Sequence, residues 1–166
     1  MRYFCPFYGI VSFYFKYYGE VITYLCMTAP MSIMATIEWI KNPYGDTKEV
    51  AVKKITKKDI ALMFCFTVLV TVVFYFILKA LKTESLIVST ISITTSFLAV
   101  YLTYLRSSFY ALAYAANDIV LIVLWVIASV KNISYLPMVI CFLMFLINDI
   151  YGFYNWEKMR KRQNRE

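Results

Sequence analysis

The chain alternates long apolar stretches with short polar segments, and the apolar stretches have the length of membrane-spanning helices. A bilayer core is crossed by about 20 consecutive apolar residues. Backbone polar groups inside lipid must bond to one another, so such stretches are expected to be helical. A shorter apolar run, Tyr3–Phe15, comes first. The full spans that follow are predicted at Val21–Ile40, Ile60–Leu81, Leu86–Leu105, Phe109–Val130 and Ile133–Trp156.

The polar segments between the spans carry turn and helix-start signals. Asn42–Asp59 contains Pro43, Tyr44, Gly45 and Asp46 in sequence, which predicts a turn. Thr56 and Asp59 are spaced as in a capping box, in which each side chain bonds the other's backbone N–H, so a helix is expected to begin there. A tight turn is predicted at Arg106–Ser108.

Basic residues collect on one side of the predicted membrane. Alternation of the spans places 13 of the 17 Lys and Arg residues on the side that holds the Asn42–Asp59 loop and the C-terminus, and 4 on the other. Cytoplasmic segments of membrane proteins carry such an excess of positive charge. The C-terminus is therefore predicted to be cytoplasmic, and the positive charge is not taken as a sign of nucleic-acid binding.

The composition supports a membrane location and removes most catalytic chemistry. Of the residues, 61% are apolar and 16% are charged, there are 4 Gly, and there is no His. No residue set supplies a nucleophile with a base. We therefore predict no enzyme activity, no catalytic residue, no cofactor and no metal site. The four cysteines lie in apolar stretches and are expected to be buried, reduced thiols.

Two predicted spans end with a similar pattern. Ala35–Lys41 and Gly152–Lys158 both read small-x-x-polar-Trp-x-Lys, with Trp39 and Trp156 at the same place. A Trp followed by Lys is also an ordinary anchor at the membrane surface. Three spans lie between the span Val21–Ile40 and the last span, and the last span ends like Val21–Ile40. The alternative interpretation is therefore a parallel repeat of two three-helix units joined by one helix.

Polar residues inside the last two spans are the candidate site. Asn117-Asp118-Ile119 and Asn148-Asp149-Ile150 repeat one tripeptide. Polar groups in hydrocarbon usually face the protein interior. They either bond neighbouring helices together or form a substrate site, and we favour the site. Residues at helical spacing with the first pair are Tyr110, Tyr114, Leu121 and Trp125, and with the second pair Tyr151, Gly152 and Asn155.

These side chains suit binding without reaction. Amides can pair with a ribose hydroxyl or a carboxamide. Aromatic rings can stack on a flat ring, with an added attraction if that ring is cationic. A carboxylate can balance a positive charge on the ligand. A separate small-residue stripe on Leu86–Leu105 favours close helix packing, and comprises Ser89, Ser92, Ser96, Ala99 and Thr103.

The segments LRSSFYALAYAANDIVLIVLW and FLINDIYGFYNWEKMRKRQ resemble the PnuC family of nicotinamide riboside transporters. NPYGDTKEV and STISITTSFLAVYLTYLRS look like the form of that family in low-GC Gram-positive bacteria. The resemblance runs from about Tyr17 onward. It implies an all-α polytopic membrane protein with two three-helix bundles joined by a linker helix.

Relative to that family pattern the chain is an N-terminally short member. We expect a partial first bundle at 1–41, a basic loop at 42–59, a linker helix at 60–82, a second bundle at 83–156 and a basic tail at 157–166. Either the start is truncated, or assembly with another copy as a homo-oligomer completes the pathway.

The resemblance implies facilitated uptake of nicotinamide riboside across the bacterial plasma membrane for NAD synthesis, with a cytosolic riboside kinase trapping the product. The binding residues that it implies are Asn117, Trp125, Asn148 and Asn155, with Tyr151 and Trp156 nearby. Asp118 and Tyr114 complete the predicted site. Many family members have Trp where this chain has Tyr110 and Tyr114. The alternatives are therefore a transporter of thiamine, riboflavin or a deoxynucleoside, and a membrane fragment that transports nothing.

Overall fold

The computed structural model describes residues 22–45, 49–83 and 85–165, so the predicted run Tyr3–Phe15 lies outside the described residues. The described part is helical. A π-helix, η1, runs over Thr23–Thr28, and a short 3-10 helix, η2, over Ile133–Tyr135. The α-helices are α3 (Ala29–Lys41), α4 (Lys57–Ala80), α5 (Leu86–Tyr104), α6 (Tyr110–Lys131) and α7 (Leu136–Gln163).

Four of the predicted spans match helices that are long and apolar enough to cross a membrane, namely α4, α5, α6 and η2 with α7. The first predicted span, Val21–Ile40, corresponds to η1 followed directly by α3. Pro30 stands at the start of α3 and has no N–H to donate to the carbonyl four residues earlier. The change from π-helix to α-helix occurs beside it.

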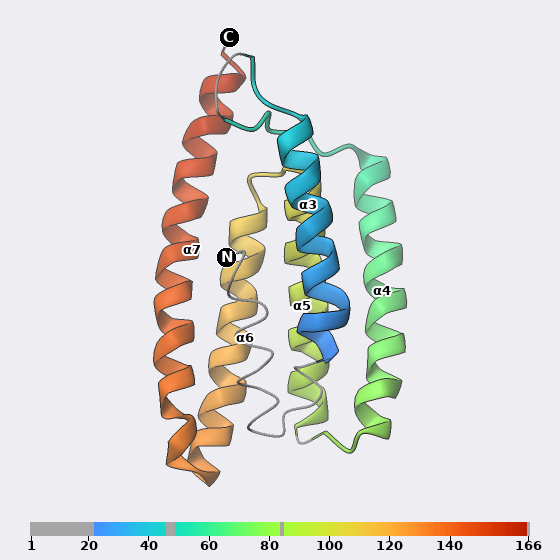
Figure 1. The fold of residues 1–166 in the computed structure, drawn as a ribbon, viewed down its shortest axis with the longest axis vertical. Helices are drawn as coiled ribbons and strands as arrows, with labels where there is room; N and C mark the ends of the chain where they lie inside the picture. Colours follow the sequence, from blue (N-terminus) through green and yellow to red (C-terminus); the bar gives the residue numbers. More distant parts are fainter. Residues whose placement is uncertain (1–21, 46–48, 84, 166) are drawn as a thin grey trace.

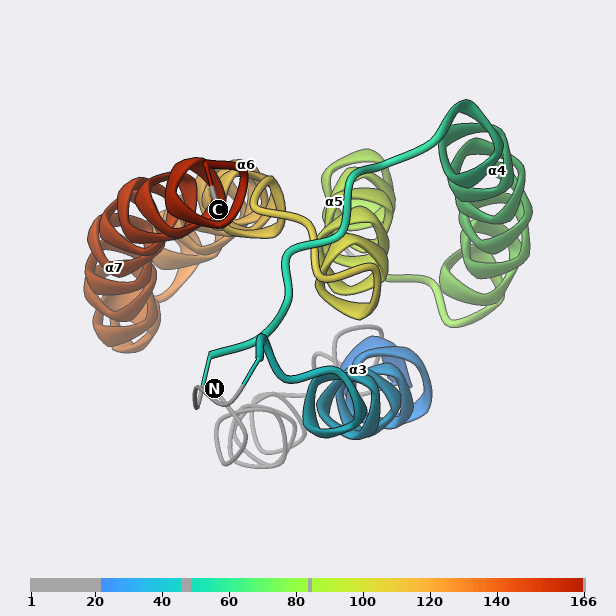
Figure 2. The same ribbon diagram turned by 90° about the horizontal axis from the view of Figure 1, so that it is seen from above.

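The helices run side by side along the long axis of the molecule (Figure 1). Figure 2 shows α5 in the middle, with α3, α4 and α6 around it and α7 on the far side of α6. We call the end where α3 and α7 finish and α4 begins the loop end. The opposite end, where α4 connects to α5 and α6 connects to η2 and α7, is the turn end.

The predicted small-residue stripe explains why α5 can be central. Ser89, Ser92, Ser96 and Ala99 are all buried. Small side chains let helix backbones approach closely, which is the main source of helix association in lipid. By contrast few residues of α4 are buried, with 6% of its most apolar stretch buried against 44% for α5. A hydrogen bond of 2.8 Å between Thr71 Oγ1 and Thr94 Oγ1 ties α4 to α5.

Backbone geometry ends α4 and α5 in the same way. Lys82 and Arg106 follow these helices with φ of 52° and 54°, in the left-handed region. The next residue's N–H, on Thr83 or Ser107, then bonds back to a carbonyl five residues earlier, at 3.1 Å in both cases. This pairing satisfies carbonyls that a helix end leaves open. The predicted tight turn at Arg106–Ser108 is confirmed in this form.

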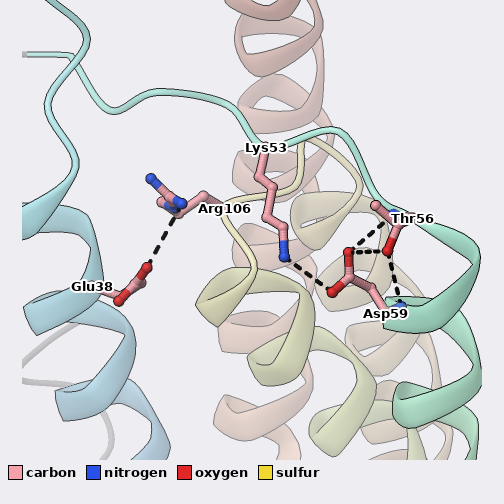
Figure 3. A network of polar contacts seen from close by, with 5 residues as sticks. All are labelled: Glu38, Lys53, Thr56, Asp59 and Arg106. Carbon is pink, nitrogen blue, oxygen red and sulfur yellow. Dashed lines mark hydrogen bonds and ion pairs between the residues drawn. The ribbon is translucent and has the colours of Figure 1, made fainter.

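The predicted capping box at the start of α4 is also confirmed. Thr56 Oγ1 accepts from the Asp59 N–H at 3.2 Å, and Asp59 Oδ2 accepts from the Thr56 N–H at 3.0 Å. Lys53 Nζ lies 3.0 Å from Asp59 Oδ1, while the Lys53 N–H donates to the Arg106 carbonyl at 3.2 Å. Arg106 in turn pairs with Glu38 at 3.7 Å (Figure 3). These contacts join α3, α4 and the α5–α6 turn at the loop end.

The last helix is longer than the sequence pattern predicts. We expected the span to end at Trp156 and a basic tail to follow, but α7 continues to Gln163. Glu157 accepts from Ser108 Oγ at 2.7 Å and pairs with Arg160 at 2.7 Å. Gln163 bonds the backbone of the 42–56 loop, accepting from the Val52 N–H at 2.9 Å. The partners outside α7, Ser108 and Val52, hold the charged end in the helix.

The cysteines differ from the expectation. Cys26 and Cys65 are exposed and Cys141 is half-buried, so these three are free thiols on outer or partly covered helix faces. The prediction that they are buried was wrong for Cys26 and Cys65. Cys65 lies on α4, whose surface is covered little by other helices. Cys5 lies outside the described residues.

Candidate substrate-binding site

The interface between α6 and α7 holds Asp118, Trp125 and Trp156 of the predicted site, and its two halves differ. The half near the turn end is an apolar cluster of Leu121, Leu124, Trp125, Ala128, Val139 and Phe142. The half near the loop end carries carboxyl groups and aromatic rings. The polar half is therefore the part of the interface whose side chains can bind a polar or aromatic ligand.

Asp118 on α6 and Asp149 on α7 face each other inside this interface. They are 5% and 4% exposed, and their carboxyl groups lie within hydrogen-bonding reach of each other. An ionised carboxylate only accepts hydrogen bonds, so two carboxyl groups can bond each other only when one of them carries a proton. The Oδ2 atom of each is buried without a hydrogen-bond partner in the described part of the chain. Such atoms are uncommon in native proteins and call for an explanation.

Three aromatic side chains from three helices meet on the loop-end side of this pair, and we call them the aromatic group: Trp39, Tyr110 and Trp156. The ring centroids of Trp39 and Trp156 are 5.1 Å apart, and those of Tyr110 and Trp156 are 4.9 Å apart with planes at 85°. Trp39 and Tyr110 are 5.8 Å apart at 71°. Edge-to-face contacts of this kind are favourable for aromatic rings.

A hydrogen bond to the backbone of α5 fixes one member of the aromatic group. The indole N–H of Trp39 donates to the Thr103 carbonyl on α5 at 2.7 Å. A ring that is held by such a bond keeps its orientation for a flat ligand.

The carboxyl pair and the aromatic group lie along one line of the interface. Asp149 and Trp156 are separated by two turns of α7, or roughly 10 Å along the axis. Gly152 stands between them, and a Cβ there would be 3.8 Å from the Ala111 Cβ. This short distance shows that α6 and α7 are close at that point. A small ligand whose ring lies at the aromatic group could therefore also reach the carboxyl pair.

Asn117 is turned toward α5 instead. Its Oδ1 accepts from Thr95 Oγ1 at 2.8 Å and from Ser96 Oγ at 2.9 Å. Its side-chain carbonyl therefore bonds two helices together, which is the role that the sequence left as the alternative. Asn117 and Asp118 are neighbours in the chain, yet they serve different interfaces.

Trp125 lies in the apolar half of the interface. It is 0% exposed, and its ring is 5.7 Å from that of Tyr135. The predicted residues Asn148, Tyr151 and Asn155 fall on a different face of α7 from Asp149 and are exposed. Tyr114 is half-buried and meets Tyr110 edge-on at 6.2 Å. The binding roles given to these residues stay predictions.

Trp39, Tyr110 and Asp149 are not among the predicted binding residues. Asp149 and Tyr110 were recognised on the polar faces of their helices but were not selected. The signal for Trp39 was the ending shared by α3 and α7, because the structure places Trp39 and Trp156 in contact. The similarity of the two endings thus marks a tertiary contact as well as a membrane boundary.

Comparisons with known proteins agree on one family. The sequence matches the family described as nicotinamide mononucleotide transporter over residues 3–158. It is 29% identical over 162 residues to a nicotinamide riboside transporter PnuC of Neisseria mucosa, covering 95% of this chain and 62% of that protein. A crystal structure of the vitamin B3 transporter PnuC is similar at a TM-score of 0.76 and 29% identity, covering 94% of this chain and 68% of that chain.

The chain thus spans about 62% of the length of the curated relative that it matches. The match to the family covers nearly all of this chain, and the structural match confirms the predicted helical membrane fold. With four helices of the described residues able to cross a bilayer, this is a multi-pass membrane protein. The chain belongs to the nicotinamide mononucleotide transporter family.

Proposed function

We propose that this chain mediates the facilitated movement of nicotinamide riboside across the bacterial plasma membrane. The observation that carries the proposal is the aromatic group, held on three helices beside a buried carboxyl pair, in a chain of this transporter family. The relatives are named for the transport of nicotinamide riboside and of vitamin B3.

The chemistry of the ligand supports this assignment. Nicotinamide riboside joins a flat pyridinium ring, which is cationic, to a carboxamide and a ribose. Aromatic faces attract a cationic ring by about 0.5–2 kcal/mol. Carboxylate oxygens accept from the carboxamide and the ribose hydroxyls. Exposed Asn148 and Asn155 add amides on the neighbouring face of α7.

The orientation and the partners follow from the charge pattern and the family. The loop end carries the Asn42–Asp59 loop and the basic end of α7, so we place it in the cytoplasm. Riboside released there would be trapped by a cytosolic kinase, which makes downhill entry effective. Assembly of the chain into a homo-oligomer stays a prediction, and light scattering by the purified chain in detergent tests it.

Uptake of radiolabelled nicotinamide riboside by bacteria that lack their own uptake system tests the proposal. Cells making the wild-type chain should accumulate label, and Trp156→Ala should reduce the initial rate at least about tenfold, because it removes a ring from the aromatic group. Tyr154→Ala is the matched control, since Tyr154 is 68% exposed and outside the group. No uptake by the wild-type chain, or equal rates for the two variants, would contradict the assignment.

A second candidate is a related vitamin or nucleoside. Tyr110 and Tyr114, which meet edge-on, stand where many family members have Trp, and they change the surface that a ring would contact. Competition by unlabelled thiamine, riboflavin or thymidine in the same uptake assay separates these ligands from the riboside. If none of these compounds binds the purified chain, the membrane-fragment alternative is favoured.

A further inference from the structure

The carboxyl pair has a property that neither side chain has alone, namely a single negative charge shared by two groups. Asp118 and Asp149 are within hydrogen-bonding reach, and each keeps a buried Oδ2 without a partner in the described residues. Two carboxyl groups at this separation cannot both ionise at low cost, as the paired aspartates of some proteases show. One shared proton leaves the pair with one negative charge.

No basic side chain of the described helices balances that charge. Between Ser107 and Val130, and again between Asn132 and Glu157, the sequence contains no Lys or Arg. The ion pairs of the described residues, such as those of Arg106 and Arg160, lie at the loop end. A charge buried within the bilayer is expensive and usually serves an ion or a substrate.

We propose that Asp118 and Asp149 act together as a monoanionic site that selects ligands with one positive charge. This inference rests on the proposed function and deepens it, because it names the feature of the ligand that the pair recognises. The free Oδ2 atoms supply acceptors, and the shared charge balances the pyridinium, whose ring contacts the aromatic group about two helical turns away.

Oxidised and reduced nicotinamide riboside form a matched pair of ligands for the test. They share the ribose and the carboxamide, but the oxidised ring is cationic and the reduced dihydropyridine ring is neutral. Calorimetric titration of the purified full chain in lipid nanodiscs measures both affinities. We expect the wild-type chain to bind the oxidised form at least about tenfold more tightly than the reduced form.

Single and double substitutions separate the shared charge from the individual carboxyl groups. Asp118→Asn and Asp149→Asn each leave one carboxylate bonded to an amide, so the charge is unchanged and the preference should persist. The double variant D118N/D149N has no charge and should bind the two forms equally. Its binding of the reduced form reports that it is folded. Loss of the preference in either single variant would overturn the proposal.

Acidification of the wild-type chain gives a second test that needs no substitution. A second proton on the pair removes its charge, so binding of the oxidised form should weaken toward that of the reduced form, which should change little. Of the described residues, the other titratable groups facing the pair are Tyr110 on α6 and Cys141 on α7. Tyr110→Phe and Cys141→Ser should leave the acid effect in place.

The outcomes distinguish this inference from the proposed function. Equal binding of the two forms by the wild-type chain would overturn the inference and leave the function standing. Binding of neither form would contradict the function, and the inference with it. A preference that disappears only in the double variant and on acidification would support both.

Discussion

The two halves of the α6–α7 interface use tryptophan in different ways. In the half near the turn end, Trp125 is completely buried in a closed apolar cluster. In the half near the loop end, Trp156 is half-buried and meets rings from α3 and α6. A buried ring that is surrounded by apolar neighbours contributes to stability. A ring that is held in place yet partly accessible can also contact a ligand.

The difference teaches that polarity alone does not mark the site. Asn117 is as buried as Asp118, but its carbonyl accepts two hydrogen bonds from α5. Asp118 and Asp149 each leave a buried oxygen unpaired in the described part of the chain. A buried polar group that has hydrogen-bond partners on another helix bonds the helices together, whereas a group without such partners can bind a ligand. The adjacent residues Asn117 and Asp118 differ in this respect.

The strongest test of the comparison is Trp125→Ala. Removal of a fully buried Trp leaves a cavity, and the expected loss of unfolding free energy is about 3 kcal/mol or more. Denaturation in mixed micelles measures it. Val126→Ala is the control, because the neighbouring Val126 is 44% exposed. Equal losses for the two variants would contradict the assignment of this half as a closed core.

Trp156→Ala should, in contrast, lower the affinity for the ligand more than the stability of the fold. We expect the affinity for nicotinamide riboside to fall about tenfold, which corresponds to about 1.4 kcal/mol, because a stacking ring is lost. The loss of unfolding free energy should be clearly smaller than for Trp125→Ala. Calorimetry and denaturation on the same preparation give both numbers. If Trp125→Ala weakened binding more than Trp156→Ala while still folded, the two halves would have to be reassigned.

Asn117→Ala should affect stability and leave charge selection alone. Interhelical hydrogen bonds in membrane proteins contribute about 0.6 kcal/mol each on average, so removing two should cost about 1 kcal/mol. The ratio of the affinities for oxidised and reduced riboside should stay at its wild-type value. A changed ratio would show that Asn117 belongs with the carboxyl pair.

Arg162→Ala should have the smallest effect. Arg162 pairs with Glu49 at the loop end, where both side chains are substantially exposed. Exposed ion pairs contribute about 0–1 kcal/mol, and less as salt increases. Denaturation at low and high salt should therefore show a loss below about 0.5 kcal/mol that shrinks with salt. A larger loss would mean that the loop contact fixes the end of α7 more firmly than its exposure suggests.

Local signals were enough to predict the helices and several of their ends. The apolar stretches predicted α4, α5 and α6 nearly to the residue, and the Thr56–Asp59 pattern predicted the start of α4. These features depend on interactions between near neighbours in the chain, which sequence patterns record directly. The continuation of α7 to Gln163 was missed because its partners, Ser108 and Val52, lie far away in the sequence.

The sequence by itself determined that this chain is a helical membrane protein, which residues its spans contain and which spans carry polar groups. Only the tertiary structure decided that Asp118 meets Asp149, that Asn117 turns to α5 and that Trp39 joins Trp156. Periodicity fixes the face of a helix on which a residue lies. The rotation and neighbours of each helix, which decide what that face meets, are set by packing between distant segments.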